Sequence, residues 1–322
     1  SNYRHRPWQL KTPLRDAEAL ATLLREQQGF ETTVLTDPSA AQMLELFAQI
    51  KLDNQAENAR VLIYFAGHGV QRDSANGLKG YFLPADAVPG EDASMVPMET
   101  LSDALREIPA RHLLLVLDCC FAGTFRMPEK RSIGFDSLSA PLRRQHFDIF
   151  CNFPSRLVLS STSHRQKALD RLEDGDVNSP FNRFLRQAIG GEADYTRDRL
   201  VTASELKTYL TDNVSRITGD LGNLQSVGLD ALEGDGEGEF LFFLDGFDAA
   251  RLPEQAYINP YKGLQSYEQG DAALFFGRQK ATAALFDKAK NHAFVIVAGA
   301  SGTGKSSLVK AGLLPRLAGR RI

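Results

Sequence analysis

The chain has 322 residues, of which 43% are hydrophobic, and this composition supports about two domains with buried cores. Thirty-seven Lys and Arg against forty Asp and Glu leave a formal net charge of −3, so neither nucleic acid nor an anionic membrane is predicted as a partner. Three cysteines, two of them adjacent, exclude a disulfide framework and fit a reducing compartment. No signal peptide and no apolar run of about 20 residues is found, so a cytoplasmic protein is expected.

The first part of the chain alternates predicted helices and strands. Buried apolar strands that alternate with amphipathic helices predict an α/β fold with a mainly parallel sheet covered on both faces. The predicted elements are a helix over 14–28 ended by Gly29, a short strand over 32–35, a helix from a Ser39/Gln42 capping box through residue 50, and apolar strands leading to His68 and to Cys120.

His68 and Cys120 each follow one of these apolar strands. A thiol is a strong nucleophile only as the thiolate, and a nearby imidazole can take its proton, so this pair predicts a cysteine nucleophile with its base. A lone histidine after a strand is more often structural, but glycines on both sides of His68 let a substrate approach closely. Because side chains alternate across a strand, Asp118 shares the face of Cys120, whereas Cys119 is expected to be a small buried hydrophobe, as is Cys151.

The segment 124–154 has no sustained period and is predicted to be a long exposed loop. Its basic pairs make it a candidate for self-cleavage at Lys130, Arg131, Arg143 and Arg144. After this loop the pattern predicts a strand over 156–161, a helix over 181–189, a helix opened by the Thr202/Glu205 capping box, and a final strand over 239–244.

A second domain is predicted after the linker that follows the last strand. A helix over 281–290 and a buried strand over 293–298 precede the sequence 299–306, which fits the P-loop pattern GxxxxGKS at the start of a helix. In this motif backbone N–H groups cradle phosphates, Lys305 reaches the β- and γ-phosphates, and Ser306 binds Mg²⁺. No acidic strand follows to hold the metal, so nucleotide binding is expected but hydrolysis is not assigned to these residues.

Two sequence boxes resemble those of metacaspases and bacterial caspase-like peptidases, the C14 peptidases. Ala66-Gly67-His68-Gly69 is similar to their Ser/Ala-Gly-His-Gly box, and Asp118-Cys119-Cys120-Phe121-Ala122-Gly123 to their Asp-x-Cys-(His/Phe)-(Ser/Ala)-Gly box. The separation of the two boxes is close to the roughly 50 residues between histidine and cysteine in caspases. The similarity continues at Ser179-Pro180-Phe181 and at Gly236-Glu237-Gly238-Glu239-Phe240.

This resemblance implies a caspase-like sandwich over residues 1–247, with a large portion 1–123, the linker loop 124–154 and a small portion 155–247. It implies a Cys-His dyad of Cys120 and His68, with the backbone N–H groups of Gly69 and Cys120 as the oxyanion hole. Asp118 would bind an Arg or Lys before the scissile bond. Asp170 is either a second acid of this pocket or an ordinary surface residue.

The sequence beyond a linker at 248–258 resembles the start of the STAND signalling NTPases. The similar segments are Asn259-Pro260-Tyr261-Lys262-Gly263-Leu264, Phe275-Phe276-Gly277-Arg278 and the P-loop. Residues 259–322 would thus be the N-terminal part of a P-loop NTPase α/β domain that binds ATP and Mg²⁺. The expected nucleotide contacts are Gly299, Gly302, Thr303, Gly304, Lys305 and Ser306.

Together the two resemblances imply an endopeptidase that cleaves proteins after basic residues and is controlled by a nucleotide switch, through a sensor region or trigger molecule, in bacterial defence or cell death. One alternative is a signalling ATPase with a caspase-like interaction scaffold, which would not need the dyad. Another is a thiol-redox protein, which the lack of a CxxC spacing disfavours. No metal site is predicted: Asp170, Glu173, Asp174 and Asp176 could bind Ca²⁺, but an exposed acidic turn is the simpler and favoured account.

Overall fold

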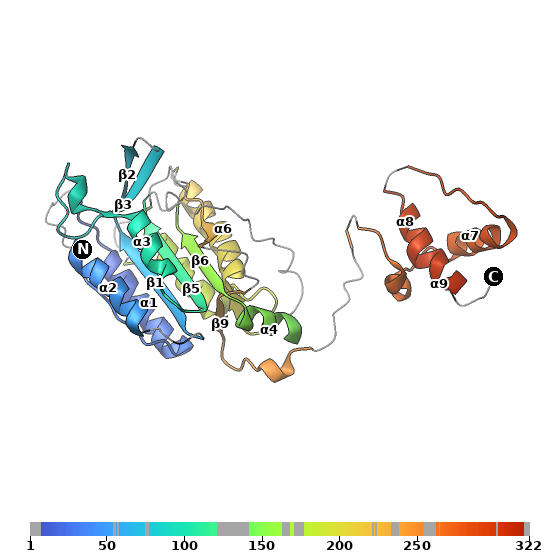
Figure 1. Ribbon diagram of the computed structural model, residues 1–322, viewed down its shortest axis with the longest axis horizontal. Coiled ribbons are helices and arrows are strands. Elements are labelled where there is room, and N and C mark those ends of the chain that lie inside the picture. Colours follow the sequence, from blue (N-terminus) through green and yellow to red (C-terminus); the bar gives the residue numbers. More distant parts are fainter. Residues whose placement is uncertain are drawn as a thin grey trace. The chain divides into compact units, whose positions relative to one another are not determined.

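A computed structural model describes residues 8–53, 56, 58–74, 77–120, 142–162, 168–170, 177–220, 222, 224–232, 238–253, 262–263, 265–300 and 302–318. The chain divides into two compact units, 1–255 and 256–322 (Figure 1). In the described residues no helix is both long enough and apolar enough to span a lipid bilayer.

The first unit is built on a four-stranded sheet with the order β1-β5-β6-β8. Its strands are β1 (Arg60–Gly67), β5 (His112–Cys119), β6 (Ser155–Ser160) and β8 (Gly228–Ala231). The first three strands are parallel and β8 is antiparallel to β6. Parallel ladders run from Arg60↔His112 to Gly67↔Cys119 and from His112↔Ser155 to Leu117↔Ser160. The predicted α/β fold with a mainly parallel sheet is therefore confirmed.

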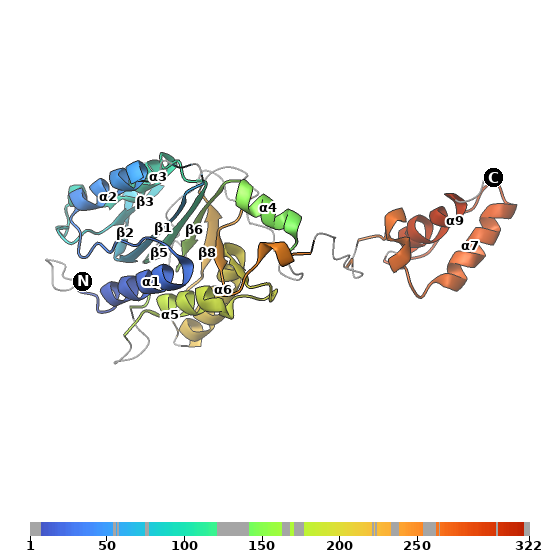
Figure 2. The ribbon, with the colours of Figure 1, turned by 90° about the horizontal axis from the view of Figure 1, so that it is seen from below.

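Helices cover both faces of this sheet, as Figure 2 shows. One face carries α1 (Pro13–Gln28), α5 (Pro180–Gln187) and α6 (Ala203–Asp220), and the other carries α2 (Ala40–Asp53) and α3 (Met98–Arg106). Strand β5 divides its side chains between the two cores: Leu114 and Val116 pack with the first set of helices, whereas Leu113, Leu115 and Cys119 pack with the second. Because side chains alternate along a buried strand, the position of a residue in β5 decides which of the two sets of helices its side chain contacts.

Local signals in the sequence set the ends of several helices. Gly29, with φ 69°, ends α1 in the left-handed conformation that glycine adopts without strain. The predicted capping boxes form at α2, between Ser39 and Gln42, and at α6, between Thr202 and Glu205. Ser179 caps α5, because its hydroxyl accepts a hydrogen bond from the Asn182 N–H at 3.0 Å.

Two smaller sheets complete this unit. The strands β2 (Gly69–Ser74), β3 (Gly77–Phe82) and β4 (Val96–Pro97) form an antiparallel sheet, and β7 (Leu200–Thr202) pairs with β9 (Leu241–Phe243). Only the last of these strands was predicted, and it is shorter than expected. Strand β2 begins immediately after His68, so the histidine lies at the turn between the central sheet and the hairpin.

Two expectations for this unit are wrong. Residues 32–35 do not form a strand and pair with no strand of the described chain. The loop predicted over 124–154 contains a helix, α4 (Arg144–Asn152). Its aromatic Phe147 packs against Phe243 and Phe247, with ring centroids 6.4 and 5.4 Å apart. Tertiary packing thus stabilises a helix that the sequence pattern alone does not reveal.

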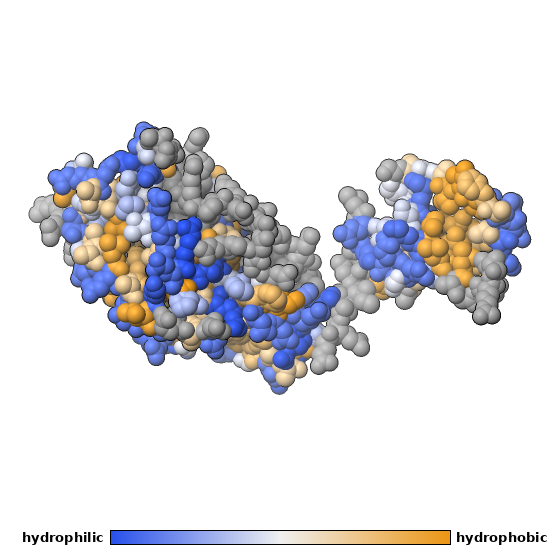
Figure 3. Space-filling view, in the orientation of Figure 1, coloured by the Kyte–Doolittle hydropathy of each residue, from blue (hydrophilic) through white to orange (hydrophobic). Residues whose placement is uncertain are grey.

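The described part of the second unit is made of helices and irregular segments. They are α7 (Gln279–Asn291), α8 (Lys305–Ser307) and α9 (Leu314–Ala318), with a π-helical segment over 308–313 joining the last two. The buried strand predicted over 293–298 is wrong, because these residues are irregular and Phe294 and Ile296 are exposed. No described strand of this unit can pair with them. Hydrophobic side chains gather on one face of the unit (Figure 3).

Candidate active site

The parallel register of β1 and β5 brings the two predicted catalytic residues to the same edge of the sheet. Gly67 pairs with Cys119, and His68 and Cys120 are the next residues of their chains. Both side chains line one narrow cleft of about 60 Å³. Ligands of open α/β sheets bind outside the carboxyl ends of the strands, and this cleft lies there.

The cleft is closed by parts of the chain that are far apart in sequence. Its walls come from the segment before α1, from α1 itself, from the ends of β1 and β5, from residues 168–170 and from the N-cap of α5. The lining residues are Leu10, Thr12, Pro13, Asp16, Ala66, Gly67, His68, Asp118, Cys120, Ala168, Leu169, Asp170 and Ser179. The structure therefore brings together all of the predicted catalytic and pocket side chains.

A backbone carbonyl orients the ring of His68. Its Nε2 lies 2.7 Å from the carbonyl oxygen of Trp8. Because a carbonyl can only accept, this contact places the proton on Nε2 and leaves Nδ1 of the neutral ring as the basic atom. Burial lowers the pKa of His68 below its ordinary value, which favours the neutral, proton-accepting ring near pH 7. The role of Trp8 could not be predicted from the sequence, because a backbone carbonyl has no residue signature.

The adjacent cysteines lie in different surroundings. Cys119 is 0% exposed and packs in the core beneath α2 and α3, where burial raises the pKa of its thiol well above the ordinary value. Cys120 is partly exposed in the cleft, with its Sγ 4.0 Å from the carbonyl oxygen of Ala168. A reactive thiol must be accessible and able to ionise, and only Cys120 lies where a substrate can reach it.

Asp118 lies at the base of the cleft and is 6% exposed. Its Oδ2 accepts hydrogen bonds from the hydroxyls of Ser179, at 2.6 Å, and Tyr64, at 3.2 Å. Burial raises the pKa of Asp118 to about 7, against the opposing effect of the hydrogen bond from Ser179.

A second buried carboxylate, Asp16, was not predicted from the sequence. It is 1% exposed and accepts hydrogen bonds from the Nδ2 of Asn178, at 2.7 Å, and from the backbone N–H of Ser179, at 3.2 Å. Burial raises its pKa as well. A signal was present, since Asp16 occupies the same face of α1 as the buried Leu20 and Leu24, where a charged residue is unusual.

Asp170 lines the cleft, and its two oxygens are both engaged. Oδ2 accepts from the Lys11 N–H at 2.9 Å, while Oδ1 accepts from the N–H and the hydroxyl of Thr12, at 3.2 and 2.9 Å. This carboxylate therefore ties the segment before α1 to the segment before α5. Leu169 is held in turn by Gln225, whose Oε1 accepts from its N–H at 3.4 Å.

Several other predicted residues lie elsewhere. Lys130 and Arg131 fall outside the described residues, as do Glu173, Asp174 and Asp176. Arg143 is the N-cap of α4, and Arg144 begins this helix and pairs with Asp148 at 3.0 Å. Within the described residues, no group of His, Cys, Asp and Glu is arranged to hold a metal ion.

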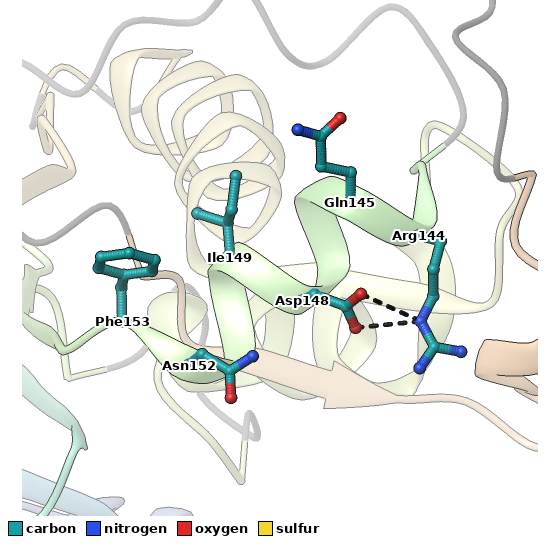
Figure 4. A pocket seen from close by; sticks show the side chains of 6 residues that line it. All are labelled: Arg144, Gln145, Asp148, Ile149, Asn152 and Phe153. Atoms are coloured by element: carbon teal, nitrogen blue, oxygen red, sulfur yellow. Dashed lines mark hydrogen bonds and ion pairs between the residues drawn. The ribbon is translucent and has the colours of Figure 1, made fainter.

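A larger hollow of about 440 Å³ lies along α4, and Figure 4 shows its side chains around the Arg144–Asp148 ion pair. It lies at the opposite edge of the sheet, because Phe153 at the end of α4 accepts a hydrogen bond from His112, the first residue of β5. The hollow contains no nucleophile or histidine, so its size does not make it the active site.

The P-loop of the second unit has the backbone turns that its motif requires. Gly302 and Gly304 have φ of 80° and 78°, which glycine adopts without strain. Lys305 donates from Nζ to the carbonyl oxygens of Gly299 and Ala300, at 2.8 and 2.6 Å, and Thr303 donates from its hydroxyl to Ala300 at 2.9 Å. The ammonium group is thus already folded over the loop that would surround a phosphate.

The chain matches the caspase domain family over residues 1–223. It belongs to the caspase family of peptidases. A second match, to the family described as novel STAND NTPase 1, covers residues 260–321 of this caspase-domain protein. A curated relative is Metacaspase-3 of Arabidopsis thaliana, 25% identical over 146 residues, with 38% of this chain and 38% of the relative covered. The chain thus spans well under half of that relative.

These matches confirm both resemblances found in the sequence. The protein is a caspase domain followed by a STAND NTPase segment. The caspase domain is a family of peptidases, and the STAND proteins are a family of NTPases.

Proposed function

We propose that the caspase domain is a cysteine endopeptidase that cleaves proteins after Arg or Lys, with Cys120 as nucleophile and His68 as general base and acid. The observation that carries the proposal is the shared cleft, which His68 and Cys120 line together with the buried carboxylates of Asp16 and Asp118. A nucleophile and its base at a carboxylate-lined pocket match the chemistry of cleavage after a cationic residue.

In the first step Nδ1 of His68 takes the Sγ proton of Cys120 while sulfur forms a bond to the scissile carbonyl carbon. The backbone N–H groups of Gly69 and Cys120 stabilise the resulting oxyanion. The intermediate collapses to a thioester as the C–N bond breaks, and the amine leaves with the proton from His68. Water then attacks the thioester, His68 takes the proton of this water and returns a proton to Sγ, and the acid product departs. Throughout, the carbonyl of Trp8 keeps Nε2 protonated and the ring in place.

Specificity for basic residues comes from the carboxylates at the base of the cleft. A guanidinium can pair with Asp118 through two parallel hydrogen bonds, whereas an acidic side chain would place like charges together. Truncating one partner of a buried charge pair costs on the order of 2 to 5 kcal/mol, which is well over tenfold in affinity. We therefore expect cleavage after Arg, then after Lys, and almost none after Asp.

The STAND segment is proposed to regulate the peptidase through bound nucleotide. Backbone N–H groups of the P-loop and Lys305 would hold the phosphates, and Ser306 would hold Mg²⁺. ATP would supply a γ-phosphate whose presence or absence distinguishes two states of the switch. A protease joined to such a switch suits a bacterial defence or cell-death role, in which a trigger acts through the NTPase module.

A fluorogenic peptide panel that varies only the residue before the scissile bond tests the activity and its specificity. Alkylation with a peptide chloromethylketone, followed by mass spectrometry, identifies the nucleophile. Cys120→Ala should abolish cleavage, whereas Cys119→Ala should keep most of it. Equal loss in two folded variants, or preferred cleavage after Asp, would refute the proposal.

The P-loop also supports a second reading, in which the protein is a signalling ATPase and its caspase domain an interaction scaffold. Lys305→Ala in the intact protein should weaken ATP binding without changing the rate at which Cys120 is alkylated. A chain that binds ATP but cleaves no peptide of the panel, with or without nucleotide, would favour the scaffold.

A further inference from the structure

Two buried carboxylates meet at one residue in the specificity pocket. Ser179 donates its hydroxyl to Asp118 and its backbone N–H to Asp16, and the exposed fractions of these acids are only 6% and 1%. Neither acid forms an ion pair with a Lys or Arg in the described part of the chain. Arg186, the nearby cation of α5, donates to the side-chain oxygens of Asn182 and Asn178, both at 2.9 Å.

Among the described residues, the other groups that line the pocket include no Lys or Arg. The titratable residues facing Asp118 are Asp16 on α1, Tyr64 on β1, His68 after β1, Cys119 and Cys120 on its own strand and beyond, and Asp170 before α5. Two buried like charges without a cation are costly, and the usual outcome is that one of them holds a proton. Asp118 is the better holder, because burial raises its pKa to about 7.

The hydrogen bonds also indicate which oxygen is protonated. Oδ2 of Asp118 already receives the hydroxyl hydrogens of Ser179 and Tyr64. Both hydroxyls donate to Oδ2, and each accepts an N–H group of Asn182, at 3.0 and 3.1 Å. A proton on Asp118 therefore belongs on Oδ1.

We propose that the empty pocket stores one proton on Asp118, and that the Arg or Lys of a substrate binds in exchange for this proton. The step breaks the O–H bond of the carboxylic acid, releases H⁺ to solvent and leaves a carboxylate paired with the cation. This inference rests on the proposed function of the cleft. The exchange makes substrate affinity depend on pH, and this dependence is independent of the protonation of His68 and Cys120.

Calorimetry of the full chain carrying Cys120→Ala tests the exchange, because this variant binds peptides without cleaving them. The probes are a hexapeptide with Arg before its uncut bond and the same peptide with norleucine there. Heats measured in phosphate and in Bis-Tris, buffers with different ionisation enthalpies, give the protons released. With a pKa of about 7 we expect close to one proton per Arg peptide at about pH 6 and close to none at about pH 8. Affinity should fall about tenfold between pH 8 and pH 6, and about fivefold of this fall lies between pH 7 and pH 6.

Variants in the Cys120→Ala background locate the proton. Asp118→Asn should abolish the release, whereas Glu239→Gln, at another buried acid remote from the cleft, and His68→Gln should keep it. Ser179→Ala removes a hydrogen bond that favours the Asp118 carboxylate, so it should move the pH dependence to higher pH. The Ser179 variant also provides the test if Asp118→Asn fails to fold.

The experiment distinguishes failure of the proton exchange from failure of the pocket assignment. Tight binding of the Arg peptide without proton release, or release that persists in Asp118→Asn, would overturn the exchange and leave the proposed function standing. Equal affinity for the Arg and norleucine peptides at every pH would instead overturn the pocket assignment itself.

Discussion

Gly69 lies directly against the backbone of Cys120, and a β-carbon added at Gly69 would lie 2.2 Å from the Cys120 carbonyl oxygen. The same β-carbon would lie 3.4 Å from the Sγ of Cys119. The nearer neighbour is a backbone atom and the Sγ of Cys119 is fully buried, so any larger residue here must move the strand end that carries the nucleophile. The glycine after the candidate base is therefore required by close packing against the nucleophile.

Gly69→Ala should accordingly lower kcat/KM for an Arg peptide on the order of a hundredfold, because a displaced nucleophile no longer meets its base in a reactive geometry. The measurement is steady-state cleavage, with circular dichroism to verify the fold. Gly190→Ala is the matched control, since a β-carbon there meets no atom within 4 Å. Near-normal activity of folded Gly69→Ala would show that the two strand ends do not form the catalytic centre.

Asp170→Asn tests whether Asp170 helps to orient His68 or binds the basic residue of the substrate. An amide keeps one acceptor where the carboxylate has two, so it loosens the tie to Lys11 and Thr12 and, through this segment, the Trp8 carbonyl that orients His68. We expect kcat to fall about tenfold while KM does not rise and the preference for Arg over Asp peptides is kept. A loss of Arg preference equal to that of Asp118→Asn would instead make Asp170 a pocket acid.

Self-cleavage, if the peptidase processes its own chain, should occur after Lys130 or Arg131 and not after Arg143 or Arg144. Proteases bind substrates as extended strands, whereas the Arg143 carbonyl accepts from the Phe147 N–H at 2.9 Å and Arg144 lies in α4. N-terminal sequencing after incubation of the active enzyme identifies the sites. A major new N-terminus at Arg144 or Gln145 would contradict this expectation, and Lys130→Ala/Arg131→Ala should prevent cleavage.

The stability of the caspase domain should decrease as pH rises through about 5 to 8. Burial raises the pKa of Glu239 to about 7, so the folded state binds more protons than the unfolded state in this window. Glu239→Gln removes the cost of ionising a buried acid and should stabilise the domain at about pH 8, on the order of 2 kcal/mol, with a smaller effect at about pH 5.

Fluorescence of Trp8, the single tryptophan of the chain, can follow this unfolding in urea. Exposed Glu31→Gln serves as the control. A parent and a Glu239→Gln chain whose stabilities change in parallel with pH would contradict the role of this acid.

Features that depend on neighbouring residues in the sequence were predicted well. The ends of β1 and β5, the capping boxes and the shared face of Asp118 and Cys120 all follow from local patterns and from the alternation of a strand. The sheet register then places His68 beside Cys120 without any further information.

Features that depend on distant partners were missed. Asp16 becomes part of the pocket only because α1 and the N-cap of α5 lie side by side, and the tie from Asp170 to Thr12 joins segments far apart in sequence. Helix α4 depends on aromatic contacts with the end of the domain. The prediction of a strand over 293–298 was wrong because an apolar run becomes a strand only where another strand can pair with it, and the described residues of this unit offer none.

The ladder between β5 and β6 should hold the caspase domain together after a backbone cut between these strands. These strands flank the segment 121–141, yet they hydrogen-bond in parallel from His112↔Ser155 to Leu117↔Ser160 at the centre of the sheet. A backbone cut between them would produce two polypeptides whose strands remain adjacent in one buried sheet, with His68 and Cys120 on the same fragment. The cut enzyme would therefore migrate as two bands under denaturing conditions and as one particle under native ones, with its cleft still assembled.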